Sequence, residues 1–409
     1  MKCRFCHANV TLPLIDLVNA PPSNAFLTRD QLDEPESYYP LRVFVCEQCW
    51  LVQVDEFKKH DEIFGADYAY FSSFSRSWLQ HSKEYVRHIT SKLGLTTKSL
   101  VVEVASNDGY LLQYFVERGI PCLGIEPTAS TATAARNKGV STHEAFWNQQ
   151  TACELVAERG KCDLLLGNNV LAHVPDINDF VAGFRTALAP KGTITFEFPS
   201  VLNLIQLNQF DTIYHEHFSY LCLGIVRRIL EAHRLTVYDV EELPTHGGSL
   251  RVYARHASYE ALPVLPSVHA LQGREVAAGL CEATGYGGAQ GAADLTRAAV
   301  LGFLCEQRSA GMRVVAYGAA AKGNTLLNYC GLKGAELVEF VVDASPHKQG
   351  LFLPGSHIPV VAERKLREVR PDFIIILPWN LRDEIVEQLS YVREWGCRFV
   401  TCIPELNVE

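Results

Sequence analysis

One short stretch near residue 100 limits the possible fold more than any other part of the sequence. Residues 100–104 are mostly apolar and predict a buried strand, and residues 105–109 have the small and polar side chains of a tight turn. A helix is expected over 110–118, and a second apolar run, 122–125, ends at Glu126. This is the nucleotide-binding βαβ arrangement, in which the terminal acid accepts hydrogen bonds from ribose hydroxyls. The turn lacks the G-x-G-x-x-G pattern, so by itself it fits an NAD site and an S-adenosylmethionine site equally well.

The segments that follow favour S-adenosylmethionine. Residues 162–176 predict a strand, a polar switch and a helix start, and residues 188–197 predict a turn and another strand. This order resembles the class I S-adenosylmethionine-dependent methyltransferases, with Ala105 in place of a glycine usually found in the first turn. The resemblance implies an α/β fold with a Rossmann-like core. The cofactor-binding residues expected from it are Glu103, Ser106, Asn107, Asp108, Glu126, Asn168 and Asn169.

Two C-x-x-C pairs near the N-terminus predict a metal site. Two thiolates in each tight turn can bind one tetrahedral ion, and two such pairs fill all four positions. Because a closed four-sulfur shell leaves no place for water, we expect a structural zinc rather than a catalytic one. Its ligands are expected to be Cys3, Cys6, Cys46 and Cys49.

Residues 211–220 hold an unusual density of polar and aromatic side chains, which includes Tyr214, His215, Glu216 and His217. No helix or strand periodicity explains this density. Imidazole titrates near neutral pH, so such a cluster can move a proton there. We therefore expect residues 211–220 to be the acid–base part of a methyl-transfer site.

The remaining segments predict the rest of the architecture. Residues 76–93 predict an amphipathic helix, residues 257–291 a loosely structured connector, and residues 292–310 a helix. Residues 313–403 then repeat strand, small-residue turn and helix, so they predict a second Rossmann-like unit. The expected domains are a zinc-binding domain (1–75), a methyltransferase core (76–256) and a C-terminal Rossmann-like α/β domain (257–409).

The composition narrows the function. The formal net charge of −9 argues against a nucleic-acid binder that works through a general basic surface. We find no N-terminal apolar signal core and no apolar run long enough to span a membrane, so a cytoplasmic protein is expected. The odd count of 13 cysteines points to thiols and metal ligands rather than disulfides.

Five motifs follow one another along the chain: Asn169-x-Leu171-x-His173, Tyr214-x-Glu216-His217, His246-Gly247-Gly248, Tyr317-Gly318-Ala319-x-Ala321-Lys322, and Pro354-Gly355-Ser356-His357-Ile358-Pro359-Val360. Together they resemble the motifs of the nucleotide-sugar C-methyltransferases, the C-3′-methyltransferases that make branched deoxysugars such as tetronitrose. The resemblance covers essentially the whole chain. It implies a nucleotide-diphosphate 4-keto-deoxysugar as substrate, with thymidine diphosphate preferred and guanosine diphosphate as the alternative, and a monomeric enzyme.

The resemblance also implies roles for individual residues. The expected catalytic residues are Tyr68, His173, Tyr214, Glu216 and His217. The residues themselves favour Lys322 and Asn324, at the start of a helix, for the nucleotide diphosphate. The other expected substrate-binding residues are His246, Arg251 and Trp379. A ketone at carbon 4 makes the proton on carbon 3 acidic, and a base must remove it. We expect His217 to be that base, with Tyr214 as its partner or as the base itself. Glu216 is expected to orient the His217 ring, and His173 to stabilise the enolate oxygen.

Three alternatives stay open at this point. A methyltransferase of another small molecule would share the same core. A nucleic-acid methyltransferase would use the zinc knuckles to grip the polymer, and it predicts basic stripes with interleaved aromatic residues. An NAD-dependent sugar oxidoreductase or epimerase would use the C-terminal unit, and it predicts a G-x-G-x-x-G turn where residues 318–323 have Gly-Ala-Ala-Ala-Lys-Gly.

Overall fold

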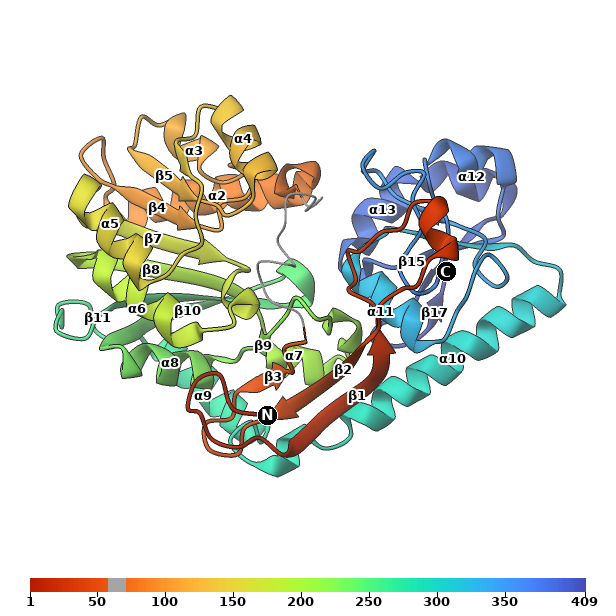
Figure 1. The fold of residues 1–409 in the computed structure, drawn as a ribbon, viewed down its shortest axis with the longest axis horizontal. Coiled ribbons are helices and arrows are strands. Elements are labelled where there is room, and N and C mark those ends of the chain that lie inside the picture. The colour runs from red at the N-terminus through yellow and green to blue at the C-terminus, as the bar shows by residue number, and fades with distance from the viewer. Residues whose placement is uncertain (58–70) are drawn as a thin grey trace.

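The described chain forms three β-sheets. The structure is a computed structural model that describes residues 1–57 and 71–409, so Tyr68 lies outside the described residues. Figure 1 shows the two larger sheets side by side, with the N-terminal sheet below and between them. Among the helices of the described ranges, none combines enough length with enough apolar character to cross a lipid bilayer.

The N-terminal sheet is antiparallel and has the order β1-β2-β3-β9. Its strands are β1 (Leu12–Ala20), β2 (Tyr39–Val45), β3 (Val52–Val54) and β9 (Ser219–Tyr220). Strand β9 directly follows the 211–218 segment, and Val52 pairs with Tyr220. The polar cluster of the middle region is therefore anchored to the N-terminal sheet.

The second sheet has the Rossmann-like form expected of the methyltransferase core. Its order is β10-β11-β8-β7-β4-β5-β6, parallel from β6 to β8 and antiparallel at β11 and β10. The strands are β4 (Val101–Val104), β5 (Cys122–Ile125), β6 (Thr142–His143), β7 (Cys162–Asn168), β8 (Leu188–Pro199), β10 (Leu235–Leu243) and β11 (Ser249–His256). Since β4, β5 and β7 are parallel, the polar residues that follow them meet at one edge of the sheet.

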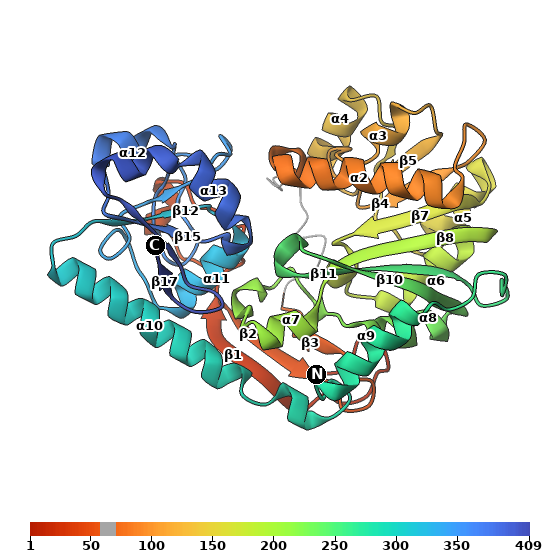
Figure 2. The same cartoon turned by 180° about the vertical axis from the view of Figure 1, so that it is seen from behind.

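Helices pack around this sheet (Figures 1 and 2). They are α3 (Gln113–Val116), α4 (Ala129–Asn137), α5 (Gln149–Arg159), α6 (Ile177–Ala187), α7 (Val201–Gln206) and α8 (Leu223–Ala232). The helix expected over 110–118 is shorter than predicted. Around it, Tyr114 and Phe115 donate to carbonyls three residues back, which tightens the backbone into turns.

Helix α2 (Arg76–Leu93) covers one face of the sheet as predicted, and it buries an ionic network. Arg251 of β11 donates to Glu197 of β8 at 2.8 Å, and its guanidinium lies 4.6 Å from the ring centroid of Tyr85 of α2. His81 of α2 is 2.9 Å from the same carboxylate. Burial alone would raise the pKa of Glu197, but the hydrogen bond with His81 and the charge of Arg251 bring it below its ordinary value.

The expectation of a loose connector over 257–291 is wrong. The segment contains α9 (Pro266–Ala277), and α10 (Ala289–Ser309) begins before its end. The Ala- and Gly-rich composition gave no sign of the buried helix face that Val268, Leu271 and Glu275 form. The Glu275 carboxylate accepts the N–H groups of Leu223 and Gly224 at 2.7 and 2.8 Å, so α9 caps the N-terminus of α8.

The C-terminal sheet forms the second Rossmann-like unit, with the order β14-β13-β12-β15-β16-β17. Its strands are β12 (Val314–Tyr317), β13 (Val341–Val342), β14 (Val360–Val361), β15 (Phe373–Ile376), β16 (Arg398–Thr401) and β17 (Asn407–Val408). Its helices are α11 (Ala321–Tyr329), α12 (Arg364–Val369) and α13 (Arg382–Gln388). Helix α10 runs along β1 toward this unit (Figure 1).

The buried ionic network gives a stability prediction. Glu197→Ala would leave the Arg251 charge buried beside only the half-exposed Glu241, so we expect the free energy of unfolding to fall by about 3–5 kcal/mol. Urea denaturation measures this. The matched control is Glu242→Ala, which removes an exposed ion pair with Arg274 and should change stability by less than about 1 kcal/mol. Equal losses in the two variants would contradict this account of the network.

Candidate active site

Tyr214 and His217 form a hydrogen-bonded pair. The His217 Nδ1 lies 3.0 Å from the backbone oxygen of Thr212, and its Nε2 lies 2.7 Å from the Tyr214 hydroxyl. A carbonyl oxygen can only accept, so Nδ1 carries the proton and Nε2 accepts the phenol proton. Burial, and then repulsion from His173, holds the pKa of His217 well below its ordinary value. The ring is therefore a neutral base with its lone pair directed at a phenol.

The expectation that Glu216 orients the His217 ring is not met, because the Thr212 carbonyl does so. The Glu216 carboxylate instead accepts from the Asn24 side-chain amide at 2.8 and 2.9 Å. Asn24 belongs to the N-terminal region and was missed by the sequence analysis. A single asparagine in a Pro- and Ser-containing loop carries no signal of a contact with residue 216.

His173 lies beside this pair, with its ring centroid 4.6 Å from that of His217. Its Nδ1 donates to the Glu216 backbone oxygen at 2.8 Å, and burial lowers its pKa to about 4. In the neutral ring Nε2 is then an acceptor. This tautomer does not suit the expected role of His173 as a donor to an enolate oxygen.

The His246-Gly247-Gly248 turn approaches the pair from the end of β10. Its His246 has a left-handed backbone (φ 54°), and burial lowers its pKa to about 4. A Cβ on Gly247 would come within 2.2 Å of the Trp379 ring, so only glycine allows this close packing. The ring of Trp78 lies 5.1 Å from that of His246 in an edge-on arrangement. The turn is therefore held between the C-terminal unit and α2.

Two of the predicted substrate-binding residues, Lys322 and Trp379, belong to the C-terminal unit and lie beside the His246-Gly247-Gly248 turn and the segment that carries Tyr214. Lys322 of α11 donates to Asn380 at 2.7 Å, and its Nζ lies 4.7 Å from the Trp379 ring centroid. Trp379 Nε1 donates to Asp211 at 2.8 Å. Thr325 donates to the backbone oxygen of Ile213 at 2.8 Å, which fixes α11 to the segment that carries the Tyr214–His217 pair.

Two further predicted substrate-binding residues differ in their surroundings. Asn324 is 1% exposed, and both polar atoms of its amide lack a hydrogen-bond partner within the described ranges. Arg251 is occupied by Glu197 and Glu241 in the network beneath α2. Arg251 is therefore part of the buried ionic network, whereas the hydrogen-bonding capacity of the Asn324 amide is not used by the described residues.

The predicted cofactor residues gather at the carboxyl ends of β4, β5 and β7. Glu126 is 4% exposed, and its carboxylate accepts from the backbone N–H groups of Asn107 and Thr128 at 2.9 and 3.0 Å. Asp108 accepts from Lys138 at 3.0 Å. A Cβ on Gly124 would lie 2.3 Å from the Ser106 hydroxyl, so the turn and β5 pack closely only because residue 124 is glycine.

This edge of the sheet has unmatched hydrogen-bonding capacity. Buried polar atoms without a partner in the described part of the chain are Glu103 Oε1 and Oε2, Ser106 Oγ, Asp108 Oδ1, Asn168 Oδ1 and Asn169 Oδ1. The amide oxygens of Asn168 and Asn169 can only accept, and the Asp108 oxygen does so when ionised, whereas burial raises the pKa of Glu103 well above its ordinary value. S-Adenosylmethionine offers matching donors in its ribose hydroxyls and amino groups. The residues present therefore fit this cofactor.

The four predicted zinc ligands lie together. The sulfur atoms of Cys3, Cys6, Cys46 and Cys49 are within 4.8 Å of one another, and the Cys3–Cys49 and Cys6–Cys46 separations are both 3.5 Å. Two sulfurs bound to tetrahedral zinc lie about 3.8 Å apart. In each knuckle an amide donates back to the first cysteine carbonyl, from His7 at 3.0 Å and Trp50 at 2.7 Å. The site fits a structural zinc.

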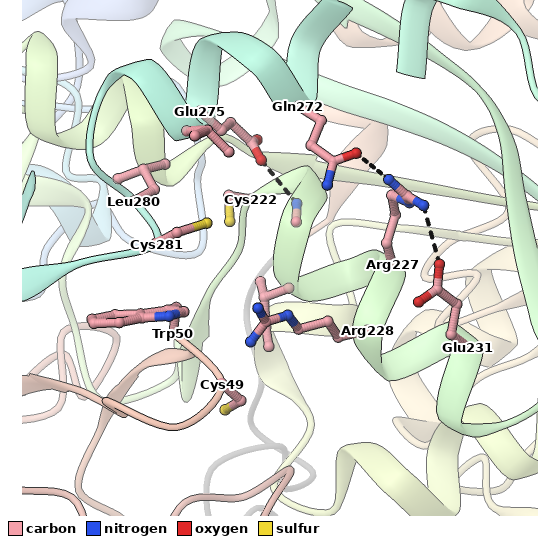
Figure 3. Close-up of a pocket in the computed structure, with 13 residues that line it drawn as sticks. Cys49, Trp50, Cys222, Arg227, Arg228, Glu231, Gln272, Glu275, Leu280 and Cys281 are labelled. Carbon is pink, nitrogen blue, oxygen red and sulfur yellow. Dashed lines mark hydrogen bonds and ion pairs between the residues drawn. The ribbon is translucent and has the colours of Figure 1, made fainter. Parts of the chain in front are cut away.

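A cavity of about 140 Å³ lies elsewhere, where the zinc knuckle meets α8 and α9 (Figure 3). Its polar lining includes Arg227, Arg228 and Glu275, and Trp50 forms one wall. Among the described residues that line it, the zinc ligand Cys49 is the one predicted site residue. It is therefore separate from the predicted catalytic and cofactor residues.

Comparisons with known families agree with this arrangement. Residues 3–64 match a family described as a zinc binding domain, residues 78–240 a methyltransferase domain, and residues 244–404 a C-methyltransferase C-terminal domain. The protein is thus a class I S-adenosylmethionine-dependent methyltransferase with a zinc-binding domain, and S-adenosylmethionine is its cofactor.

The relatives define the family more closely. The chain is 34% identical over 407 residues to the C-methyltransferase NovU of Streptomyces niveus, across 100% of this chain and 96% of that protein. It therefore belongs to this C-methyltransferase family. The ubiquinone biosynthesis O-methyltransferase of Pasteurella multocida is 32% identical over 116 residues, 25% of this chain and 47% of that protein.

Solved structures also align with the chain. One is the magnesium protoporphyrin IX methyltransferase of Synechocystis PCC 6803 with bound SAM, at 13% identity and a TM-score of 0.35, over 49% of this chain and 99% of that one. Another is an S-adenosylmethionine-dependent methyltransferase of Clostridium acetobutylicum, at 10% identity and a TM-score of 0.35, over 44% of this chain and 92% of that one.

The zinc site gives a direct prediction. Cys46→Ser should remove most of the bound zinc and lower the unfolding temperature by several degrees, because the metal stabilises only the folded knuckles. Elemental analysis and thermal unfolding measure the two effects. Cys153→Ser, which changes an exposed thiol outside the cluster, should leave about one zinc per chain. Equal zinc content in both variants would contradict the assignment.

Proposed function

We propose that the enzyme methylates carbon 3 of a 4-keto-6-deoxy sugar attached to a nucleoside diphosphate. A saturated sugar carbon is not a nucleophile until an adjacent ketone makes its proton acidic. A C-methyltransferase of such a carbon therefore needs a base as well as the cofactor. The observation that carries the proposal is the Tyr214–His217 pair, with a neutral imidazole Nε2 that accepts the phenol proton.

The pair supports a proton relay through two groups. The C–H proton moves to the Tyr214 oxygen while the phenol proton moves to His217 Nε2, and the electron pair of the C–H bond forms the enolate. The His217 imidazolium that results keeps its Nδ1–H hydrogen bond to the Thr212 carbonyl. If the substrate displaces the phenol, His217 removes the proton directly. General-base catalysis of this kind contributes about 10²–10⁴-fold to a rate.

The remaining residues hold and enclose the reactants. Bound S-adenosylmethionine supplies an electrophilic methyl group. Glu126, Asn168 and Asn169 orient it at the edge of the sheet that ends beside His173. The Asn24–Glu216 contact brings the N-terminal region over the site, and this favours exclusion of water.

The C-terminal unit is proposed to bind the nucleotide part of the substrate. The first turn of α11 offers backbone amides, which suit phosphate oxygens, and Asn324 offers a buried amide without a partner in the described ranges. Trp379 and His246 lie beside the first turn of α11. We propose a thymidine diphosphate sugar in preference to a guanosine diphosphate sugar, and a monomeric enzyme.

Proton exchange tests the base without the methyl transfer. Each of a panel of TDP- and GDP-linked 4-keto-6-deoxy sugars is incubated with enzyme in deuterated water without S-adenosylmethionine, and deuterium at carbon 3 is followed by NMR. We expect exchange with at least one sugar, and an approximately 10²–10⁴-fold slower rate for His217→Asn and for Tyr214→Phe.

His233→Asn is the matched control, because His233 is bonded to Asn178 outside the cluster and should exchange at the wild-type rate. Cofactor binding by calorimetry should be the same in all the variants. Full exchange by both His217→Asn and Tyr214→Phe would exclude the pair as the base. Absence of both exchange and methylation across the panel would exclude the proposed substrate class.

A further inference from the structure

Removal of a proton next to a ketone places negative charge on the ketone oxygen, and a donor must stabilise that charge. Neutral His173 and His217 do not supply it, because each has its N–H committed to a backbone carbonyl. The Tyr214 hydroxyl donates to His217, and the Trp379 N–H donates to Asp211. Among the described residues, the donor is therefore to be sought in another side chain near the pair.

Lys322 has the necessary donors. Its Nζ carries three N–H bonds in the charged form, and one hydrogen bond, to Asn380 Oδ1, is present among the described residues. The ammonium also lies over the Trp379 ring, 4.7 Å from its centroid, and its remaining N–H bonds have no hydrogen-bond acceptor among the described residues. Burial lowers the pKa of Lys322, and the charge of Asp211 opposes this change, so Asp211 favours the ammonium form.

A series of direct contacts connects Lys322 with the Tyr214–His217 pair. Lys322 lies on Trp379, Trp379 is bonded to Asp211, and Asp211 directly precedes Thr212, whose carbonyl holds His217. Trp379 also packs against Gly247, next to His246. Repulsion from Lys322 contributes, after burial, to the lowered pKa values of both His217 and His246. The cation thus acts electrostatically on both rings.

We propose that the Lys322 ammonium donates a hydrogen bond to the ketone oxygen of the sugar and stabilises the negative charge that develops there. This deepens the proposed function and rests on it. The carbon–hydrogen pair becomes the new carbon–carbon π bond, the carbonyl π pair moves to oxygen, and the proton leaves through Tyr214 and His217. Lys322 donates without losing its proton, so charge and atoms balance.

Two features favour this role over binding of the diphosphate. Lys322 is held by Asn380 and by the Trp379 ring, which packs against the turn that carries His246, and a fixed cation stabilises an oxyanion strongly in a water-poor site. His246 is the competing donor, since its Nδ1 is buried and has no hydrogen-bond partner within the described residues. An ammonium carries a full charge, whereas neutral His246 offers only a dipole, so Lys322 is the stronger donor.

The test compares exchange at carbon 3 with binding of thymidine diphosphate, which has the two phosphates but no ketone. We expect Lys322→Met to slow exchange at saturating sugar at least 100-fold while changing the dissociation constant for thymidine diphosphate less than threefold. Lys322→Arg should recover part of the exchange. Lys365→Met removes an exposed charge from the same unit and should leave both readouts unchanged.

The outcomes are distinct. Wild-type exchange rates in Lys322→Met would overturn the role of Lys322 while leaving the proposed function intact. If Lys322→Met raised the dissociation constant for thymidine diphosphate tenfold or more, with normal exchange at saturating sugar, Lys322 would be assigned to the diphosphate instead. A 100-fold loss in His246→Asn and none in Lys322→Met would assign the oxyanion to His246. Failure of the wild-type enzyme to exchange any sugar of the panel would count against the proposed function itself.

Discussion

The site depends on one backbone hydrogen bond, from His217 Nδ1 to the Thr212 carbonyl. It fixes the tautomer, and so it turns the Nε2 lone pair toward the Tyr214 hydroxyl at 2.7 Å. Without it the ring could carry its proton on Nε2 and would donate to the phenol instead of accepting from it. Burial adds the second condition, because it keeps the ring neutral. Geometry and desolvation together make this imidazole a base at neutral pH.

Three distant parts of the chain hold that segment in place. Strand β9 pairs with β3 of the N-terminal sheet at one end, and Asn24 binds Glu216 in the middle. On the other side, Thr325 of the C-terminal unit binds the Ile213 carbonyl, and Trp379 binds Asp211. The zinc site contributes at a distance, because it closes the turns beside β3. The site is thus shared among three parts, and each part limits its movement.

Local sequence predicted much of this and failed where contacts are long-range. The C-x-x-C spacing, the acids at strand ends and the density of polar groups around His217 are local patterns with a direct physical meaning. No sequence pattern marks Asn24 or the Thr212 carbonyl, because an isolated asparagine and a backbone oxygen give no sign of the residue that they will contact. Helix α9 was missed because its stability comes from capping α8 through Glu275 rather than from its own composition. The sequence alone also could not show that Arg251 would pair with Glu197.

The most direct test of the central claim is the protonation state and tautomer of His217 in solution. Histidine ¹⁵N NMR, with the resonance assigned by its loss in His217→Asn, reports both. The account predicts a neutral ring protonated on Nδ1 at pH 6.5, where an ordinary histidine is half charged. An imidazolium at that pH, or a neutral ring with the proton on Nε2, would contradict it.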